Sequence, residues 1–103
     1  MRKITEKIAN AFLLSNHKSI GNTRTSGKAV YLHGNKIAEK RQDGIYLSLA
    51  GWNTPTTRER LNGILQVFNI EGGFTQKQFE PYFNGERICA GDWIRVHAYP
   101  FAE

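Results

Sequence analysis

Hydroxyl and guanidinium side chains gather in the stretch GWNTPTTRERLNG at residues 51–63, where they could bind a phosphate. Its Thr-Pro pair predicts the beginning of a helix, because proline is tolerated at the first helical position. A helix N-terminus attracts anions, so Thr56, Thr57 and Arg58 could hold a phosphate there. Thr56 and Glu59 also have the spacing of a capping box, in which side chains accept hydrogen bonds from backbone N–H groups. We expect the cap as the main role and the phosphate site as the alternative.

Basic and aromatic residues alternate in the segment YLHGNKIAEK at residues 31–40. Alternate residues of a strand point to one face of a sheet. The residues expected on that face are Tyr31, His33, Lys36, Lys40, Tyr46 and Ser48. Cations beside aromatic rings suit single-stranded nucleic acid, through attraction to its backbone and stacking of its bases. An ordinary solvated face, or one covered by the N-terminal helix, would explain the same residues. Trp52 and Trp93 could add stacking surfaces, although core positions are their more ordinary explanation.

Patterns for metal binding, cofactor binding and catalysis are weak. His17, His33, His97 and Cys89 are scattered along the chain, unlike the closely paired ligands of a structural zinc site. Cys89 has no base near it in sequence, no serine lies in a nucleophile elbow, and the glycines form no phosphate-binding loop. We therefore expect no metal, no cofactor and no catalytic residue, and a protein that acts by binding.

The composition predicts one small domain with a basic N-terminal half. The chain has 103 residues, of which 40% are hydrophobic and 22% charged, so we expect a single domain over residues 1–103. Residues 1–41 carry nine Lys/Arg and two Glu, whereas residues 42–103 carry five Lys/Arg and seven Asp/Glu, for a net charge of +5. A basic half favours polyanionic partners such as nucleic acid or a nucleoprotein, with a solvated face as the ordinary explanation.

The cellular location follows from what the sequence lacks. No apolar run approaches the roughly 20 residues of a membrane span. The N-terminus has no apolar centre of the kind a signal peptide needs, and a single cysteine agrees with a reducing compartment. We expect a cytoplasmic protein that does not contact membranes.

The elements that position these residues follow from hydrophobic spacing. Apolar residues at helical intervals predict a helix over residues 4–14, followed by a loop or irregular edge over 15–28. A period of two with Gly-Asn and Asp-Gly turns predicts a three-stranded antiparallel meander over 28–50. Its predicted pairings are Leu32 with Ile37, across a turn at Gly34-Asn35, and Arg41 with Ile45, across a three-residue loop.

The second half of the chain predicts mixed elements. A short helix is expected near residues 55–64, a strand over 63–70 and an edge or broken strand over 74–83, which contains Pro81. A tight turn at Asn84-Gly85 and a last strand over 92–99 complete the chain. The expected fold is α+β, with an N-terminal helix, an antiparallel sheet of about five strands and one short helix inserted after the third strand.

Several short motifs resemble a family of small proteins encoded by tailed bacteriophages. The matching segments are GNT (21–23), YLHGNKIA (31–38), GW (51–52), TTRERLNG (56–63), YFNG (82–85) and DW (92–93). The sequence departs from this pattern at FTQKQFEP, where the resemblance implies a tighter hairpin. The resemblance implies a short phage accessory protein that acts inside an infected bacterium, and it carries over no catalytic or binding residue.

Two functional hypotheses follow. The first is contact with nucleic acid or a nucleoprotein through the basic half. Its expected site residues are Arg24, Tyr31, His33, Lys36, Lys40 and Arg58. The alternative is a protein-binding inhibitor of a host enzyme or defence system, similar to an anti-CRISPR protein, which would use an apolar patch. The expected residues of that patch are Phe79, Tyr82, Phe83 and Trp93.

Overall fold

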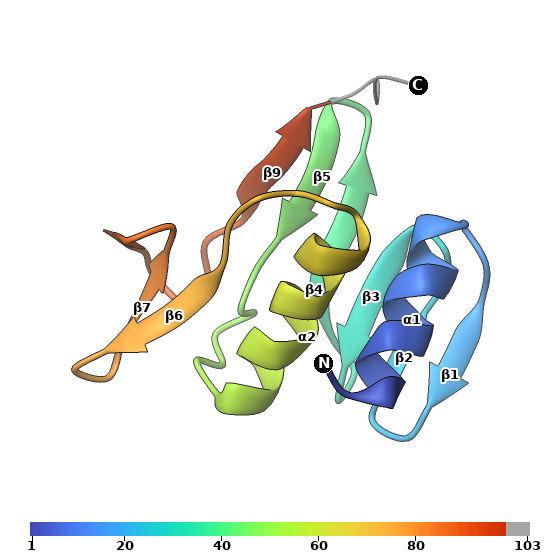
Figure 1. Cartoon of the computed structure of the whole chain (residues 1–103), viewed down its shortest axis with the longest axis horizontal. Coiled ribbons are helices and arrows are strands. Elements are labelled where there is room, and N and C mark those ends of the chain that lie inside the picture. Colours follow the sequence, from blue (N-terminus) through green and yellow to red (C-terminus); the bar gives the residue numbers. More distant parts are fainter. Residues whose placement is uncertain (99–103) are drawn as a thin grey trace.

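The computed structural model describes residues 1–98, which form two helices and two antiparallel sheets (Figure 1). Helix α1 spans Lys3–Leu13 and helix α2 spans Pro55–Val67. The large sheet has the order β1 (Lys18–Ile20), β2 (Thr23–Thr25), β3 (Ala29–Leu32), β4 (Asn35–Arg41), β5 (Gly44–Leu47) and β9 (Ile94–Ala98). The small sheet has the order β6 (Phe74–Lys77), β7 (Glu80–Phe83) and β8 (Glu86–Arg87). The predicted α+β class is confirmed, and neither helix is long and apolar enough to cross a membrane.

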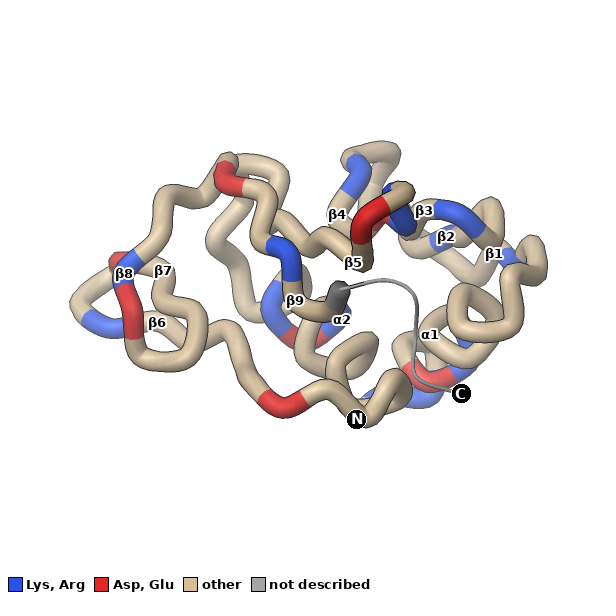
Figure 2. Tube along the Cα trace, turned by 90° about the horizontal axis from the view of Figure 1, so that it is seen from above, with Lys and Arg blue, Asp and Glu red and all other residues tan. Residues whose placement is uncertain are grey.

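Both helices pack on the same face of the large sheet, which has a covered inner face and an opposite, outer face (Figure 2). The core joins Ile8, Phe12, Leu61, Ile64 and Leu65 of the helices to Val30, Ile37, Ile45 and Leu47 of the sheet. Each of these side chains is at most 2% exposed. Burying one such side chain is worth about 1.5–3 kcal/mol, so the apolar face decides which side the helices cover. The N-terminal helix therefore covers the apolar face and leaves the basic one open.

The turn between β3 and β4 lies one residue earlier than the sequence predicts. Its central residues are His33 and Gly34, whose φ values are +51° and +81°. Positive φ at both central positions matches the twist of a two-residue hairpin. Leu32 consequently pairs with Asn35, and the predicted pairing of Leu32 with Ile37 is wrong.

A β-bulge in β4 reverses the alternation of side chains along the rest of that strand. The register shifts at Ile37, which has no direct partner in β3 and is 1% exposed. An extra residue of this kind moves every later residue to the opposite face. Lys40 therefore pairs with Ile45 on the inner face, and the predicted pairing of Arg41 with Ile45 is wrong. Glu39 and Arg41 take the outer positions.

Two segments of the chain differ from their predicted secondary structure. Residues 15–28, expected as a loop or irregular edge, contain the short strands β1 and β2. The predicted strand over 63–70 is wrong, because α2 continues to Val67. The apolar residues of that segment recur at helical intervals, and this spacing outweighs the break expected at Gly63.

The small sheet extends away from the helices on the side of Arg58 and Asn62 of α2 (Figure 1). Its first two strands form a tight hairpin that turns at Gln78 and Phe79. The predicted turn at Asn84 and Gly85 is confirmed. Pro81, expected on an edge or in a broken strand, lies in the central strand β7. Strand β8 pairs with β7 only beyond Pro81, so the missing N–H group is tolerated.

The N-terminus of α2 is capped by its own threonines. Thr54 is the N-cap residue, and its Oγ1 accepts a hydrogen bond from the backbone N–H of Thr57 at 3.2 Å. The two hydroxyl oxygens are 2.9 Å apart, and Pro55 occupies the first helical position. The predicted capping box of Thr56 and Glu59 is wrong, because the Glu59 carboxylate bonds to α1 instead.

The two helices approach each other closely at Gly63. A Cβ atom at this position would lie 2.2 Å from Cγ2 of Thr5 and 3.0 Å from Sδ of Met1. Glycine costs a helix interior up to about 1 kcal/mol relative to alanine. The contact between the helices explains why this position nevertheless holds glycine.

Gly63→Ala is expected to lower the free energy of unfolding by about 1–3 kcal/mol, because the added methyl must displace Thr5. In the double variant G63A/T5S, serine keeps the hydroxyl and removes the methyl, so part of the loss should be recovered. Urea unfolding of both variants at pH 7 measures the difference. Equal losses of stability in the single and double variants would show that the clash with the Thr5 methyl is not the cause of the destabilisation.

Candidate nucleic-acid interface

The outer sheet face carries cationic and aromatic side chains from five strands and one loop. Strand pairing places Arg24 opposite Tyr31 and Tyr31 opposite Lys36, which puts these three residues on one face. Beyond the bulge, Glu39 pairs with Tyr46, which pairs in turn with Arg95. The residues of the outer sheet face are Arg24, Tyr31, Lys36, Glu39, Arg41, Tyr46, Trp93 and Arg95.

Two arginines lie over aromatic rings on this face. The Arg24 guanidinium carbon is 4.0 Å from the centroid of Tyr31. That of Arg41 is 4.0 Å from Tyr46 and 5.1 Å from Trp93. Cation–π contacts of this kind contribute roughly 0.5–1 kcal/mol when exposed. The Arg24 side chain is exposed, and Arg41 keeps its terminal N–H groups beyond the Nε–H that bonds to Glu39.

Glu39 links two cations of the outer sheet face. Its carboxylate oxygens are 2.7 Å from Nζ of Lys36 and 2.7 Å from Nε of Arg41. The hydrogen bonds from Lys36 and Arg41 lower the pKa of Glu39, and the bond to Glu39 raises the pKa of Lys36. All three groups are therefore charged at neutral pH, and one carboxylate partly neutralises two cations.

A second carboxylate lies at the end of the face, in the turn between β4 and β5. Asp43 Oδ2 accepts a hydrogen bond from the Tyr46 hydroxyl at 2.7 Å and lies 3.7 Å from Nη1 of Arg95. The bond to Asp43 raises the pKa of Tyr46, which holds the phenol in its protonated form. The outer sheet face therefore carries two anions, Glu39 and Asp43, and four cations, so its net charge is positive.

The structure brings together only half of the residues predicted for nucleic-acid contact. Tyr31 and Lys36 lie on the outer sheet face, as expected, and Arg24, expected in a loop or irregular edge, joins them from β2. His33 lies in the β3–β4 turn at the end of the face, and Arg58 lies on α2. The face also includes Arg41, which sequence reasoning missed because the bulge in β4 changes which residues alternate, and Arg95, which reaches the face through the pairing of β9 with β5. Ser48, expected on the face, is buried at 1% exposure.

Lys40 is wrongly placed by the sequence prediction, since it points to the inner face. Its Nζ donates to the Phe12 carbonyl at 2.5 Å and to Oγ of Ser15 at 2.9 Å. It also lies 4.8 Å from the centroid of the Phe12 ring. Burial lowers the pKa of this lysine. Lys40 therefore ties β4 to the C-terminal end of α1.

Arg58 and Asn62 fix the small sheet to α2. Nη1 of Arg58 donates to the side chains of Asn53 and, at 3.1 Å, Gln76. The Asn62 amide donates to the Phe74 carbonyl at 3.0 Å and accepts from the Phe74 N–H at 2.7 Å. These contacts give both α2 residues a structural role beside β6.

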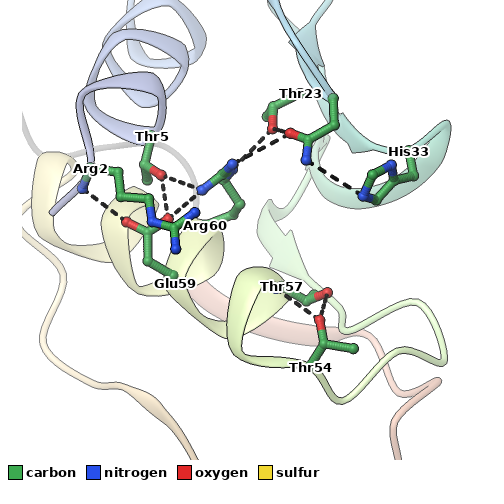
Figure 3. A network of polar contacts seen from close by, with 9 residues as sticks. Arg2, Thr5, Thr23, His33, Thr54, Thr57, Glu59 and Arg60 are labelled. Atoms are coloured by element: carbon green, nitrogen blue, oxygen red, sulfur yellow. Dashed lines mark hydrogen bonds and ion pairs between the residues drawn. The ribbon is translucent and has the colours of Figure 1, made fainter.

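A buried polar network surrounds Arg60, which is 3% exposed (Figure 3). Its guanidinium donates to the hydroxyls of Thr23 and Thr5, both at 2.9 Å, and to Oε1 of Glu59 at 2.5 Å. The same Glu59 carboxylate accepts from the Thr5 hydroxyl and from the backbone N–H of Arg2 at 3.2 Å. The network joins α1, α2 and β2 at the end of the core.

The Glu59 carboxylate is held in its charged form by this network. Burial raises the pKa of Glu59, but the hydrogen bonds from Thr5, Arg2 and Arg60 outweigh it and leave the pKa below the ordinary 4.5. The contribution of Glu59 to stability is therefore complete above its ordinary pKa. It is lost as the pH falls through the lower pKa of the folded state.

Glu59→Gln is expected to lower the free energy of unfolding at pH 7 by about 1–3 kcal/mol, because the charged acceptor is lost. The difference from wild type should shrink as the pH falls from 7 to 3, since protonation also removes that acceptor from the wild-type protein. Urea unfolding across this pH range measures it. A difference in stability that stays constant with pH would contradict the conclusion that the network holds Glu59 in its charged form.

The residues of the predicted apolar patch lie in three different environments. Phe79 is 89% exposed in the β6–β7 turn. Phe83 packs on Phe74, with ring centroids 4.8 Å apart, and Tyr82 is half-buried in β7. Trp93 belongs to the outer sheet face beside Arg41. Among these, Phe79 has the side chain most accessible to a partner.

Among residues 1–98, no three His, Cys, Asp or Glu side chains come together as a metal site would require.

Comparison with known proteins identifies the family. No curated protein and no solved structure matches the chain. The model of the family described as Kyanoviridae Gp96 protein matches residues 1–99, which confirms the resemblance to phage proteins. The chain therefore belongs to the Kyanoviridae Gp96 family, a family of phage proteins.

Proposed function

We propose that this phage accessory protein binds single-stranded nucleic acid on its outer sheet face. The observation that carries the proposal is the pair of arginine–aromatic contacts, Arg24 over Tyr31 and Arg41 over Tyr46 and Trp93. Both contacts lie on the sheet face that the helices leave open. Proteins that bind single strands combine positive charge with flat stacking surfaces in this way.

The two arginine–aromatic contacts offer two kinds of interaction to a single strand of nucleic acid. The guanidinium edges of Arg24 and Arg41 can donate paired hydrogen bonds to phosphate oxygens. The exposed Arg24 side chain can also stack on a base, because a base stacks on an arginine plane as well as on an aromatic ring. Base faces are accessible in a single strand and hidden in a duplex, which is why the proposal specifies single strands.

Two lysines on opposite faces of β4 provide a matched test of the proposal. Lys36→Ala is expected to weaken binding of a labelled single-stranded oligonucleotide about tenfold at low salt, because it removes one charge-assisted phosphate contact. Lys40→Ala removes the same charge from the inner face and should leave affinity nearly unchanged while lowering stability. Fluorescence anisotropy measures affinity, and urea unfolding measures stability. Equal losses of affinity in the two variants would contradict binding on the outer sheet face.

One observation supports the alternative of contact with a host protein. Phe79 is 89% exposed and has a φ of +67°, which is unfavourable for a bulky residue. An exposed aromatic side chain at a hairpin tip suits insertion into an apolar pocket of a partner. A protein partner captured from nuclease-treated host lysate by wild type, and lost in Phe79→Ser, is the result that this alternative predicts. Capture that depends on intact nucleic acid would favour the outer sheet face.

A further inference from the structure

A cavity of about 360 Å³ lies between the β3–β4 turn, the loop after β5 and the N-terminus of α2. Its lining residues are Leu32, His33, Asn35, Ile37, Leu49, Trp52, Thr54, Thr56 and Thr57. Leu32, Ile37 and Leu49 are at most 4% exposed and form an apolar floor. A volume of this size lies in the usual range for small planar ligands. We call this space the Trp52 cavity.

A strained turn holds Trp52 at the wall of this cavity. Ala50 and Gly51 have φ values of +54° and +85°, and the backbone N–H of Trp52 donates to the Leu49 carbonyl at 2.8 Å. The N–H of Gly51 donates to the Ala90 carbonyl at 2.9 Å, which fixes the turn to the segment before β9. The left-handed conformation is unfavourable for alanine, and such strain is found where a side chain must be presented in one position.

The indole of Trp52 has an open stacking surface. It is 58% exposed, and within residues 1–98 neither a ring nor a cation stacks on it. Tyr31, Tyr46 and Trp93 differ, since each of them is covered by an arginine. Trp52 is therefore the large aromatic surface beside the β3–β4 turn that a planar ligand can cover directly.

The polar groups of the Trp52 cavity suit a neutral ligand with donors and acceptors at its edge. The Thr54 and Thr57 hydroxyls bond to each other. The side chains of Asn35 and Thr56 make no hydrogen bond within residues 1–98, so an amide and a hydroxyl remain for a ligand. The lining contains no carboxylate that would repel a nucleotide.

We infer that the Trp52 cavity takes one unstacked base of a strand lying on the outer sheet face. The inference rests on the proposed function, and the continuity of β4 supports it. Asn35 lines the cavity, and the next residue, Lys36, lies on the outer sheet face. A nucleic-acid strand held by Lys36 can turn one base around the end of the sheet. The base then lies on the Trp52 indole, within reach of the Asn35 amide.

The two tryptophans allow each site to be observed separately. In Trp93→Phe, the remaining indole reports on the Trp52 cavity, and in Trp52→Phe it reports on the outer sheet face. Each variant is titrated with a mixed-sequence 12-mer single-stranded DNA and with an abasic strand of the same length, after circular dichroism confirms folding. The inference predicts saturable quenching of Trp52 by the 12-mer and little quenching by the abasic strand. It also predicts that Asn35→Ala reduces the affinity measured by that quenching several-fold while the salt dependence stays unchanged.

The outcomes separate the cavity from the proposed function. A response of Trp93 without a response of Trp52 would overturn the cavity and leave the outer sheet face as the binding site. Equal quenching of Trp52 by the abasic strand would show that no base is required and would also overturn the cavity. A response of Trp52 without one of Trp93 supports the cavity and counts against the outer sheet face. No response from either tryptophan overturns both.

Discussion

Replacing Arg60 with methionine is expected to lower the free energy of unfolding by about 3–5 kcal/mol, the usual cost of removing one partner of a buried charged pair. Methionine fills a similar volume but donates no hydrogen bond. The hydroxyls of Thr5 and Thr23 and the Glu59 carboxylate would each lose a donor from Arg60 at the end of the core. Urea unfolding at pH 7 measures the loss.

Arg58 on the same helix provides the matched control. Its guanidinium contacts Asn53 and Gln76 at the surface, so Arg58→Met should cost less than about 1 kcal/mol. The expected result is a clear difference between the two variants. Similar losses for Arg60→Met and Arg58→Met would mean that the buried network contributes little to stability.

The double variant R24A/R41A is expected to weaken binding of a single-stranded oligonucleotide about 100-fold at low salt, at about tenfold for each lost phosphate contact. Both substitutions also remove the guanidinium planes that cover Tyr31 and Tyr46. Loss of Arg41 leaves Glu39 with one fewer cation, which makes the face more repulsive to phosphate. Anisotropy titration of a labelled oligonucleotide measures the change.

A control with the same change in net charge separates local contact from overall attraction. R2A/R87A removes two arginines from the N-terminus and from the small sheet, both outside the outer sheet face. Long-range attraction alone predicts similar losses for the two double variants. Binding on the outer sheet face predicts that R2A/R87A loses only a few-fold. Equal losses would refute the assigned site.

Local patterns in the sequence predict much of the fold. The helix near residues 4–14, the meander over 28–50, the helix after Pro55 and the turn at Asn84-Gly85 all follow from spacing and turn residues. Strands β1 and β2 escape prediction because each has three residues and little apolar content. Pairing with β1 and β3 makes β2 a strand.

One residue limits how far the site can be predicted. The extra position at Ile37 moves Lys40 inward and Arg41 outward. A prediction that assumes strict alternation places Lys40 outward and Arg41 inward. No turn residue in the sequence marks the position of the bulge. The adjacent apolar pair Ile37-Ala38 is the available signal, since both side chains are buried.

The helix N-terminus in GWNTPTTRERLNG illustrates a second limit. Its density of threonine and arginine resembles a ligand loop, yet Thr54 and Thr57 cap the helix. Arg58 and Arg60 bond to other parts of the fold. Sequence spacing cannot distinguish an arginine that binds a ligand from one that bonds to a distant strand. Trp52, for which the sequence leaves open a stacking surface or a core position, is 58% exposed.

The salt dependence of oligonucleotide binding shows directly whether cations of the outer sheet face contact phosphates. Each phosphate contact to a single strand contributes roughly −0.7 to the slope of log Kobs against log salt concentration. Binding through the cations Arg24, Lys36, Arg41 and Arg95 of the outer sheet face predicts a slope of roughly −2 to −3 between 50 and 200 mM salt. Absence of binding at the lowest salt concentration, or a slope near zero, would contradict it.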